Sequence, residues 1–596
     1  MLSALASHSA HWIPVRFRDE KLKSWLLRQV SATSSVRDAV AIKKQTWIRS
    51  LSRSASEAGK ARMTQFDYII IGGGTSGCVT AWNLVSKYGA TVLLLEAGPS
   101  DWHPILRIPS GFVKLLGGSR YLRFYESVPQ EQLFNRTQIV PQANVLGGGS
   151  SVNAQVYQRG RKADWDAWRD YTKDDCWGWD TILPHFVRLE ANIKFNNAFH
   201  GIDGPQMVSD IAHICEMSHL YVRAVQEMGV PFNPDFNDGA PRGVGYMQVT
   251  ARNGRRRSVV DSFIAPIRSD KRLTIRTGCA ATRILIEKGR AIGVEYSRRG
   301  KVSREFARSQ VILAAGAFVT PKLLMLSGIG PTQQLSAHGI DTLVDAPGVG
   351  ANLQDHHEAP VMAQTKRNLG YYKQDVGWRM LLNGLEYVIT GRGRASTNGS
   401  ETCSYLVPDD ETGDPIIKLY CVPTTTYKDP DVSGVPDVDG VTLNACLLRP
   451  TSRGSVRLRS ADPFADPLID NNFLGNETDL RYQVAGLRAA RDVLATAPMA
   501  REIVKEIFPG AKVKSDAELS EHARRTVKTN YHPVGTCRVG AEDDPGAVVT
   551  ADLRVKGVEG LRVFDMSVVP VLMSANTNAP AMAIADRGVE LMMSKG

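Results

Sequence analysis

One short stretch constrains the fold more than any other part of the sequence. Residues 66–71 (FDYIII) form a mostly apolar run with high β propensity, which is typical of a buried parallel strand. The run continues into residues 72–77, which fit the pattern G-x-G-x-x-G, and then into a stretch with helical character. A second apolar run, residues 91–95, ends in Glu96. Strand, glycine turn, helix and strand with a terminal acid predict one βαβ dinucleotide-binding unit.

Each glycine of this motif has a physical task. Gly72 allows a tight turn, Gly74 lets the backbone approach a pyrophosphate, and Gly77 lets the helix pack closely on the strand. The helix N-terminus then offers free N–H groups to the phosphates. Glu96, 19 residues beyond Gly77, is placed to accept hydrogen bonds from ribose hydroxyls. Together these features favour nucleotide binding over a plain tight turn.

A second glycine-rich run occupies residues 146–153 (LGGGSSVN). It lets the backbone pass close to a flat ring system, although taken alone it fits a flexible surface loop equally well. Further motifs follow in order along the chain. They are 164–168 (DWDAW), 183–186 (LPHF), 311–317 (VILAAGA), 326–331 (LSGIGP), 532–537 (HPVGTC), 560–565 (GLRVFD) and 576–580 (NTNAP).

This ordered set resembles the glucose–methanol–choline (GMC) oxidoreductase family, whose members depend on FAD. The resemblance covers residues 66–593, and within the family it is greatest to choline-dehydrogenase-type alcohol dehydrogenases and to hydroxymethylfurfural or aryl-alcohol oxidases. It implies a mixed α/β and α+β fold: a Rossmann-like FAD-binding domain and a second, substrate-binding domain built on an antiparallel sheet. The FAD-binding domain is expected from residues 63–150, 245–355 and 515–596, and the substrate-binding domain from 155–245 and 356–510. Residues 441–448 and 454–458 are predicted strands of the antiparallel sheet.

The resemblance also implies a role for each residue that matches a family motif. His532 and Asn576 are implied as the catalytic pair. The implied FAD contacts are Gly72, Gly74, Thr75, Ser76 and Gly77 at the pyrophosphate, Glu96 and Ala97 at the AMP ribose, Asn153, Ala154, Gln155 and Val156 along the isoalloxazine and ribityl chain, the backbone of Ala281 (in the strand-like stretch 273–285) at the adenine, and Asp565 closing the flavin site.

Two departures from the family pattern concern the cofactor. Many relatives carry a basic triplet a few residues before the second glycine run, whereas this chain has residues 141–144 (PQAN), so one charge near the cofactor is expected to be missing. Some relatives link FAD covalently through a histidine just after the paired serines. Here that position is Val152, so we expect dissociable FAD.

The chemistry of the residues supports the same pair. Oxidising an alcohol requires removal of a hydroxyl proton and delivery of a hydride to an acceptor, here flavin N5. An imidazole has the pKa range for the proton step, so His532 is the expected base, and Asn576 is expected to hold the substrate oxygen. The predicted function is oxidation of a small alcohol, primary or aromatic, with oxygen or another electron acceptor reoxidising the flavin. The alternatives are a lyase or light-driven decarboxylase of the same fold, and a flavin-binding protein without turnover.

Other candidate residues have simpler interpretations. Asn576 also fits a helix N-terminal cap, and both roles are compatible. His356 and His357 point to opposite sides if they lie on a strand, so a structural or loop role is expected for both rather than a metal site. Residues 255–257 (RRR) are expected to form a solvated basic loop. The eight scattered cysteines suggest neither a disulfide scaffold nor a metal site.

Charge and hydropathy limit the kinds of partner that the chain is expected to bind. The formal net charge is +11, of which +8 comes from residues 1–62, so only +3 remains for the rest. A near-neutral body argues against nucleic acid as a partner, and no run is long and apolar enough to span a membrane. The basic segment 1–62 fits either a mitochondrial-type transit peptide or an upstream extension before Met63. The predicted compartment is therefore the cytoplasm, or the mitochondrion if the segment is a transit peptide.

Overall fold

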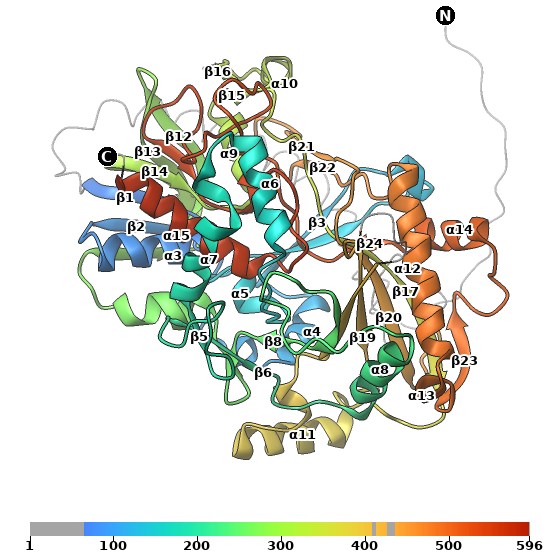
Figure 1. The fold of residues 1–596 in the computed structure, drawn as a ribbon. Coiled ribbons are helices and arrows are strands. Elements are labelled where there is room, and N and C mark those ends of the chain that lie inside the picture. Colours follow the sequence, from blue (N-terminus) through green and yellow to red (C-terminus); the bar gives the residue numbers. More distant parts are fainter. Residues whose placement is uncertain (1–64, 408–412, 426–434, 595–596) are drawn as a thin grey trace, which may run out of the picture. The chain divides into compact units, whose positions relative to one another are not determined.

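The computed structural model of the protein describes residues 65–407, 413–425 and 435–594. Residues 1–62, predicted to be an extension or transit peptide, lie outside the described residues. Within the described ranges, no helix has the length and apolar character needed to cross a bilayer. Residues Gln65–Gly596 form one compact unit, in which two large sheets organise the chain (Figure 1).

The first sheet has seven strands in the order β11-β2-β1-β14-β13-β12, with β25 also paired to β14. The pairs that join β11, β2, β1, β14 and β25 are parallel, whereas β12, β13 and β14 pair antiparallel. The bounds are β1 Gln65–Ile71, β2 Val92–Glu96, β11 Leu273–Thr277, β12 Ala280–Glu287, β13 Arg290–Arg298, β14 Lys301–Leu313 and β25 Leu561–Val563.

The predicted βαβ unit is present at the centre of this sheet. β1 lies between β2 and β14, and Ile69 and Ile70 are fully buried, as expected for a strand covered on both faces. The glycine turn leads directly into α3 (Thr75–Ser86), which starts earlier than the apolar pattern alone indicates. α3 packs against the C-terminal helix α15 (Asn578–Ser594), so the two ends of the described chain lie side by side.

The second sheet is antiparallel and also has seven strands, in the order β23-β17-β20-β19-β18-β7, with β24 paired to β17. Helix α12 (Glu477–Ala495) covers β20, and α14 (Asp516–Thr526) packs on α12 and β17. The bounds are β7 Gly243–Tyr246, β17 His357–Thr365, β18 Thr402–Leu406, β19 Ile417–Val422, β20 Gly440–Leu447, β23 Ile503–Phe508 and β24 Lys528–Thr529.

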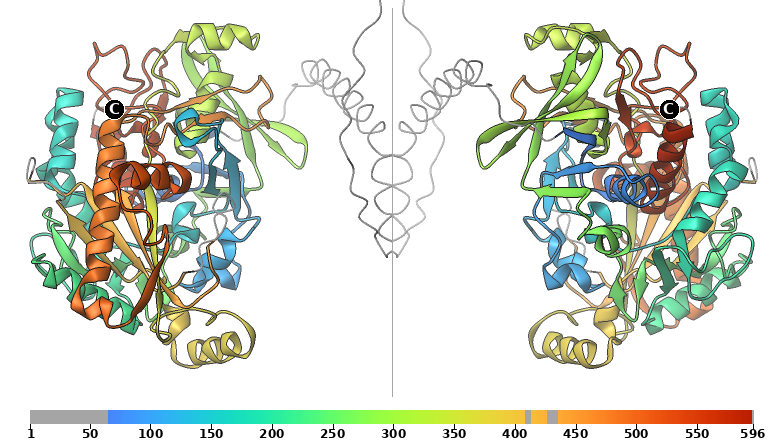
Figure 2. Two further views of the ribbon diagram at one scale, coloured as in Figure 1. Left: turned by 90° about the vertical axis from the view of Figure 1, so that its right-hand side faces the viewer. Right: turned by 90° about the vertical axis from the view of Figure 1, so that its left-hand side faces the viewer.

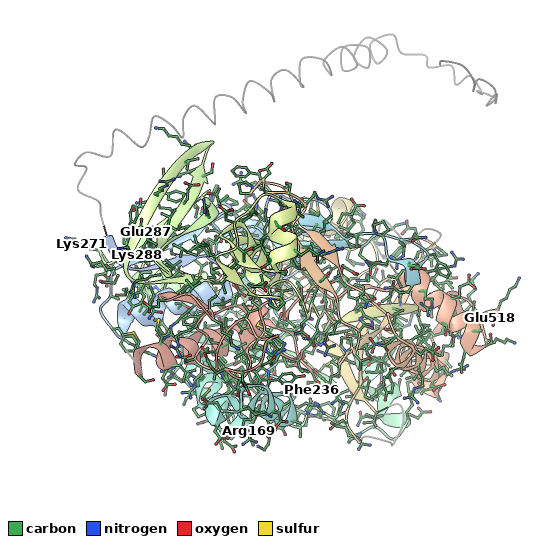
Figure 3. All side chains as sticks on the ribbon, turned by 90° about the horizontal axis from the view of Figure 1, so that it is seen from above. Arg169, Phe236, Lys271, Glu287, Lys288 and Glu518 are labelled. Atoms are coloured by element: carbon green, nitrogen blue, oxygen red, sulfur yellow. The ribbon has the colours of Figure 1, made fainter. Side chains whose placement is uncertain are left out.

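The two sheets have separate hydrophobic cores. One cluster of buried residues surrounds the first sheet and includes α3 and α15, and another lies between the second sheet and α12. In the view of Figure 3, Lys271, Glu287 and Lys288 near the edge of the first sheet lie on the opposite side from Glu518 of α14. The fold class predicted from the sequence is therefore confirmed. The exact domain boundaries stay a prediction; α14 and β24, placed in the FAD-binding part, associate with the second sheet.

Two strand predictions were wrong in detail. The stretch 273–285 is not one strand: Gly278, with a φ of +67°, separates β11 from β12. Residues 454–458 form β21 (Ser455–Arg457), which pairs with β22 (Leu468–Asp470) and not with the second sheet. Beyond β20, the backbone and side chains of Thr451 and Ser452 donate hydrogen bonds to Asp479 of α12.

Shorter elements connect the sheets and line the site. Figure 2 shows that α11 lies at the outer edge of the molecule in two further views. The remaining elements used below are α4 Gly111–Leu116, α5 Gly149–Val152, α7 Trp179–Leu189, β9 Ala251–Arg252, β10 Arg255–Arg256, α9 Gly316–Leu326 and α11 Gly377–Thr390.

Candidate active site

A cavity of about 1060 Å³ is lined by residues of both sheets. The first sheet contributes the carboxyl ends of β1, β2 and β14, where ligands bind in open α/β sheets, and the second contributes β19 and β20. Every residue predicted for the site lines this cavity except Gly77. The structure therefore brings together residues from widely separated parts of the sequence.

The first glycine turn lies at one end of the cavity and is sterically constrained. Gly72 has a φ of +107°, and a Cβ there would lie 2.2 Å from the carbonyl oxygen of Ala314. A Cβ at Gly77 would lie 1.9 Å from the carbonyl oxygen of Gly72, so this glycine allows α3 to pack against the turn from behind. Gly74 caps α3 without any side-chain hydrogen bond at the helix start. The N-terminus of α3 therefore presents backbone N–H groups to the cavity.

The hydroxyls beside this turn anchor the C-terminal helix. Thr75 Oγ1 donates to Asn578 Oδ1 at 2.8 Å, and Ser76 Oγ donates to the carbonyl of Ala581 at 3.2 Å. Thr75 and Ser76 nevertheless line the cavity. The second glycine run packs directly on the first turn, because Gly147 N donates to Gly73 O at 2.7 Å.

Glu96 ends β2 at the cavity wall, next to the exposed Ala97. Its two carboxylate oxygens accept hydrogen bonds from the backbone N–H groups of Gly73 (2.8 Å) and Gly98 (2.7 Å). Burial raises the pKa of Glu96, and these two hydrogen bonds oppose that shift. The carboxylate thus holds both loops of the nucleotide pocket in place.

Residues 153–156 follow α5 and cross the cavity wall. Asn153 is held by Arg256, whose guanidinium donates to Asn153 Oδ1 (2.7 Å) and Asn153 O (2.5 Å). Gln155 has a φ of +65° and is 1% exposed, and neither atom of its amide has a hydrogen-bond partner among the described residues. A buried amide without a partner at a cavity wall fits a polar ligand, because an unsatisfied group is costly. Ala154 and Val156 line the same wall.

Arg256 corrects two expectations. The solvated loop predicted for residues 255–257 is wrong for Arg256, which is 1% exposed because its guanidinium binds Asn153 and the carbonyl of Ser150. Arg255 is exposed, as expected. The absence of the basic triplet before the second glycine run had predicted that one charge near the cofactor is missing. Arg256 instead places a buried cation beside Asn153, in the segment predicted to bind the flavin ring. No local pattern distinguished it from its arginine neighbours.

Ala281 and Asp565 complete the first-sheet side of the cavity. Ala281 lies at the start of β12, opposite Tyr296. Asp565 follows β25, and its carboxylate accepts hydrogen bonds from Gly316 N (2.9 Å), Thr320 Oγ1 (2.6 Å) and Ser567 N (2.8 Å). Asp565 therefore fixes the N-terminus of α9 at the cavity wall.

These features fit FAD. The lining of the 1060 Å³ cavity includes both the glycine turn and the catalytic candidates, and the N-terminus of α3, which has no side-chain cap, suits a pyrophosphate. The unpartnered Gln155 amide lies in the wall that the family resemblance assigns to the flavin ring. A side chain at Gly72 could not be accommodated, so the turn has the shape that a dinucleotide site needs.

The predicted catalytic residues meet at the other end of the cavity. His532 Nε2 lies 3.3 Å from Asn576 Nδ2, although the residues come from different segments. Asn576 Oδ1 accepts hydrogen bonds from Lys418 Nζ (3.1 Å) and Tyr420 OH (3.3 Å). These contacts orient the Asn576 amide towards the histidine; within the described residues, its side chain forms no helix cap. Burial, together with His356 and Lys418, lowers the pKa of His532 well below its usual value.

A second histidine fixes the tautomer of the first. His356 Nε2 lies 3.0 Å from the carbonyl oxygen of Leu448, which can only accept, so this nitrogen carries a proton. Burial, with Lys418, lowers the pKa of His356 to about 3, so its Nδ1 is an acceptor. His532 Nδ1 lies 3.0 Å from it and must donate. His532 Nε2 therefore carries a lone pair directed at Asn576, as a proton acceptor requires.

The structural or loop role expected for His356 was therefore incomplete. The rule that neighbours on a strand point to opposite sides holds: His356 faces His532, whereas His357 begins β17 and packs on Phe473. The rule alone could not say which side faces the site. Among the described residues, no cluster of three or more His, Cys, Asp or Glu side chains has the geometry of a metal site.

Lys418 was not predicted at all. It lies on β19, is 1% exposed, and donates to the neutral amide oxygens of Gln158 and Asn576. Its Nζ also lies 5.1 Å and 4.4 Å from the ring centres of Tyr405 and Tyr420. These neighbours suit an ammonium group, which donates hydrogen bonds and is attracted by aromatic faces. Burial lowers the pKa of Lys418.

The backbone of His532 is also held. Asp355 Oδ1 accepts from His532 N at 2.8 Å, and Asp355 Oδ2 accepts from Thr529 Oγ1 at 2.5 Å. Burial raises the pKa of Asp355 to about 7. Tyr531, immediately before the histidine, has a φ of +64°, which is uncommon for a non-glycine residue and marks a constrained turn.

A dinucleotide cradle, a large cavity and a neutral histidine paired with an amide define a flavin-dependent oxidoreductase. Comparisons with known proteins agree: models of the GMC oxidoreductase family match residues 66–358 and 450–585. The chain therefore belongs to the GMC oxidoreductase family, as its motifs predicted. It is an enzyme of the FAD-dependent oxidoreductase class.

Curated relatives and solved structures also show that the chain is similar to oxidoreductases. The chain is 37% identical over 536 residues to "Alcohol dehydrogenase [acceptor]" of Pseudomonas putida, covering 89% of this chain and 96% of the relative. It is 33% identical to "Choline dehydrogenase, mitochondrial" of Homo sapiens, covering 91% and 92%. Pyridoxine 4-oxidase from Mesorbium loti has a similar structure, with a TM-score of 0.80 and 30% identity, covering 89% of this chain and 99% of that one.

Proposed function

We propose that the chain oxidises a primary or aromatic alcohol to a carbonyl compound, with His532 and Asn576 as the catalytic pair. The observation that carries this proposal is the neutral His532, whose Nε2 lone pair faces Asn576 Nδ2 at 3.3 Å in the cavity wall. The activities named for the relatives, alcohol and choline dehydrogenases, support it. A light-driven decarboxylase acts on a carboxylate and has no need of a base beside an orienting amide.

In this reaction each residue has one task. His532 Nε2 takes the hydroxyl proton, and the Asn576 amide holds the alcohol oxygen so that this proton faces the imidazole. His356 keeps Nδ1 of His532 protonated, and Asp355 accepts a hydrogen bond from the backbone N–H of His532. When bound, FAD supplies the hydride acceptor. The glycine turn, Glu96, residues 153–156, Ala281 and Asp565 hold the cofactor.

The charges around the cavity favour an uncharged alcohol over choline. Glu358 lines the cavity, but its Oε1 pairs with Lys528 at 2.8 Å and its Oε2 accepts from Asn530 Nδ2 at 2.6 Å. Lys418 adds a cation beside Asn576. A quaternary ammonium substrate would be repelled by Lys418, and the paired carboxylate of Glu358 would offset this repulsion only weakly. We expect kcat/KM for benzyl alcohol or hexanol to exceed that for choline.

The decisive experiment is anaerobic reduction of the purified holoenzyme. Alcohols are mixed with the protein without oxygen, and the yellow flavin absorbance is followed. Bleaching by benzyl alcohol or hexanol is expected, whereas a flavin that stays oxidised with every alcohol would refute the proposal in favour of a protein without turnover. Comparing oxygen with a dye as the second substrate then distinguishes an oxidase from a dehydrogenase.

We further propose that FAD is bound without a covalent link, because Val152 occupies the position of the linking histidine. Acid precipitation of the holoprotein should leave the flavin in the supernatant; a yellow pellet would contradict this. The compartment also stays a prediction, since it depends on residues 1–62, which lie outside the described residues.

A further inference from the structure

Helix α11 exposes its apolar face to solvent, whereas such a face normally packs against the core of a globular protein. Six large apolar residues follow the spacing i, i+3, i+4, i+7 that normally marks a core-facing surface. Here each of them is between 56% and 79% exposed. They are Trp378, Leu381, Leu382, Leu385, Val388 and Ile389. None of the residues of α11 is buried, which is unusual for an amphipathic helix of this length.

The polar face of α11 is the one that contacts the protein. Asn383, Gly384 and Tyr387 are half-buried, and Asn383 donates to the carbonyl of Gln374 at 2.8 Å. Figure 1 shows α11 at the lower edge of the described unit, apart from the other helices. The apolar stripe is thus not covered by any described part of the chain. An apolar patch of this extent marks an interaction surface.

Arginines flank the stripe. Arg379 lies on α11 and Arg392 follows its end, and both are exposed. The β9–β10 hairpin adds Arg252 and Arg255, also exposed, and packs on the end of α11: a Cβ at Gly254 would lie 1.8 Å from the carbonyl oxygen of Gly391. The basic run noted in the sequence therefore lies beside the apolar helix.

We propose that α11 docks in the surface of an anionic lipid bilayer, with its apolar stripe among the acyl chains and the flanking arginines at the lipid phosphates. A strong apolar face, a tryptophan near one end and arginines along the margin are the features of a helix that lies in a membrane interface. Anionic headgroups complement the arginines. A two-fold contact between two copies of the chain through the same stripe is the competing occupant, and the experiments below distinguish it.

The docking has a consequence for the cavity. Met380, Asn383 and Gly384 of α11 also line the cavity wall, as do Phe112 and Val113 of the neighbouring α4. With α11 in the interface, the cavity rim lies at the lipid surface, so alcohols dissolved in the bilayer reach the site without crossing water. This consequence rests on the proposed function, whereas the docking itself does not.

Vesicle co-sedimentation of the full-length holoenzyme tests the docking. We expect the protein to pellet with phosphatidylcholine vesicles that contain phosphatidylglycerol. The combined variant Leu381→Gln, Leu385→Gln, Val388→Gln should weaken this binding at least about tenfold, because three side chains lose their place among the acyl chains. A matched control changes three exposed apolar residues elsewhere and should bind as the wild type does: Ile193→Gln, Val302→Gln and Leu343→Gln.

A second variant tests the charge complementarity. Arg379→Gln with Arg392→Gln should weaken binding to vesicles containing phosphatidylglycerol and leave binding to pure phosphatidylcholine unchanged. Flavin content and benzyl alcohol turnover without vesicles should match the wild type in every variant, which separates failure of docking from failure of the proposed function. Wild-type binding by the leucine variant would overturn the proposal. So would a dimer in sedimentation velocity that the leucine substitutions dissociate.

Discussion

Replacement of Lys418 by methionine gives a quantitative test of the site's electrostatics. Methionine keeps the length and burial of the side chain but removes the charge beside Asn576. The Nζ–Oδ1 distance of 3.1 Å and the Nδ2–Nε2 distance of 3.3 Å place the Lys418 and His532 nitrogens within about 9 Å of each other. At that separation two unit charges repel by about 2 kcal/mol in an effective dielectric constant of about 20, so the charge of Lys418 contributes to the lowered pKa of His532.

The sign of the effect follows from which form is active. His532 accepts a proton only when neutral, so kcat/KM is full above its pKa and is lost as the pH falls through it. Burial, His356 and Lys418 all lower that pKa in the native protein. Because Lys418 contributes to that lowering, Lys418→Met removes a repulsion and raises the pKa of His532. The acid limb of the pH profile should therefore move to higher pH by more than about one unit.

The assay is kcat/KM for benzyl alcohol across the acid range, with the anaerobic reductive rate measured in parallel. Tyr420→Phe is the matched control, since it removes the other hydrogen bond to Asn576 Oδ1 without changing a charge. Both variants should slow flavin reduction, but only Lys418→Met should displace the acid limb. A Lys418→Met profile that superimposes on the wild type, or an equal displacement in Tyr420→Phe, would refute the electrostatic reasoning.

Three further substitutions have direct outcomes. His532→Ala should slow anaerobic flavin reduction on the order of 10²–10⁴-fold with FAD still bound; an unchanged rate excludes His532 as the base. His356→Phe should slow the same step at least about tenfold, because His532 is then free to adopt the wrong tautomer, and normal flavin content would exclude misfolding as the cause. Glu96→Ala should reduce the flavin-to-protein absorbance ratio after desalting more than it changes the reductive rate in excess FAD; a full ratio would contradict its assigned role.

Local sequence patterns predicted the βαβ unit that lines one part of the cavity. The βαβ unit depends on residues that are adjacent in sequence, and steric rules for glycine are local, so Gly72 and Gly77 have the packing roles that the motif indicates. The strand predicted at residues 441–448 is also present as β20 (Gly440–Leu447), one residue from its expected bounds. The strand at 454–458 was misplaced because its pairing partner, β22 (Leu468–Asp470), is not indicated by the local pattern of residues 454–458.

The contacts that charged and polar side chains make around the cavity were not predictable from sequence. Lys418 lies in a largely apolar strand, and its role depends on a hydrogen bond to Asn576, which is 158 residues away in the sequence. His356 was recognised as a candidate, but its role depends on the carbonyl of Leu448, which no pattern connects to it. Arg256 lies between two other arginines, and only the fold turns it inward while Arg255 faces solvent. Contacts of this kind form only when separate strands meet.

A histidine with a lowered pKa is a weak proton acceptor, so the proposed reaction needs the developing alkoxide to be stabilised as well. The same contacts that lower the pKa of His532 can meet that need. Lys418 donates to Asn576 Oδ1, which polarises the amide and strengthens the Nδ2–H group as the donor that would hold the alcohol oxygen in the proposed reaction. The positive charge therefore lowers the pKa of the alcohol along with that of its base. Because both pKa values fall together, the difference between the alcohol and His532 changes little. The histidine meanwhile remains neutral, and able to accept a proton, over a wider range of pH.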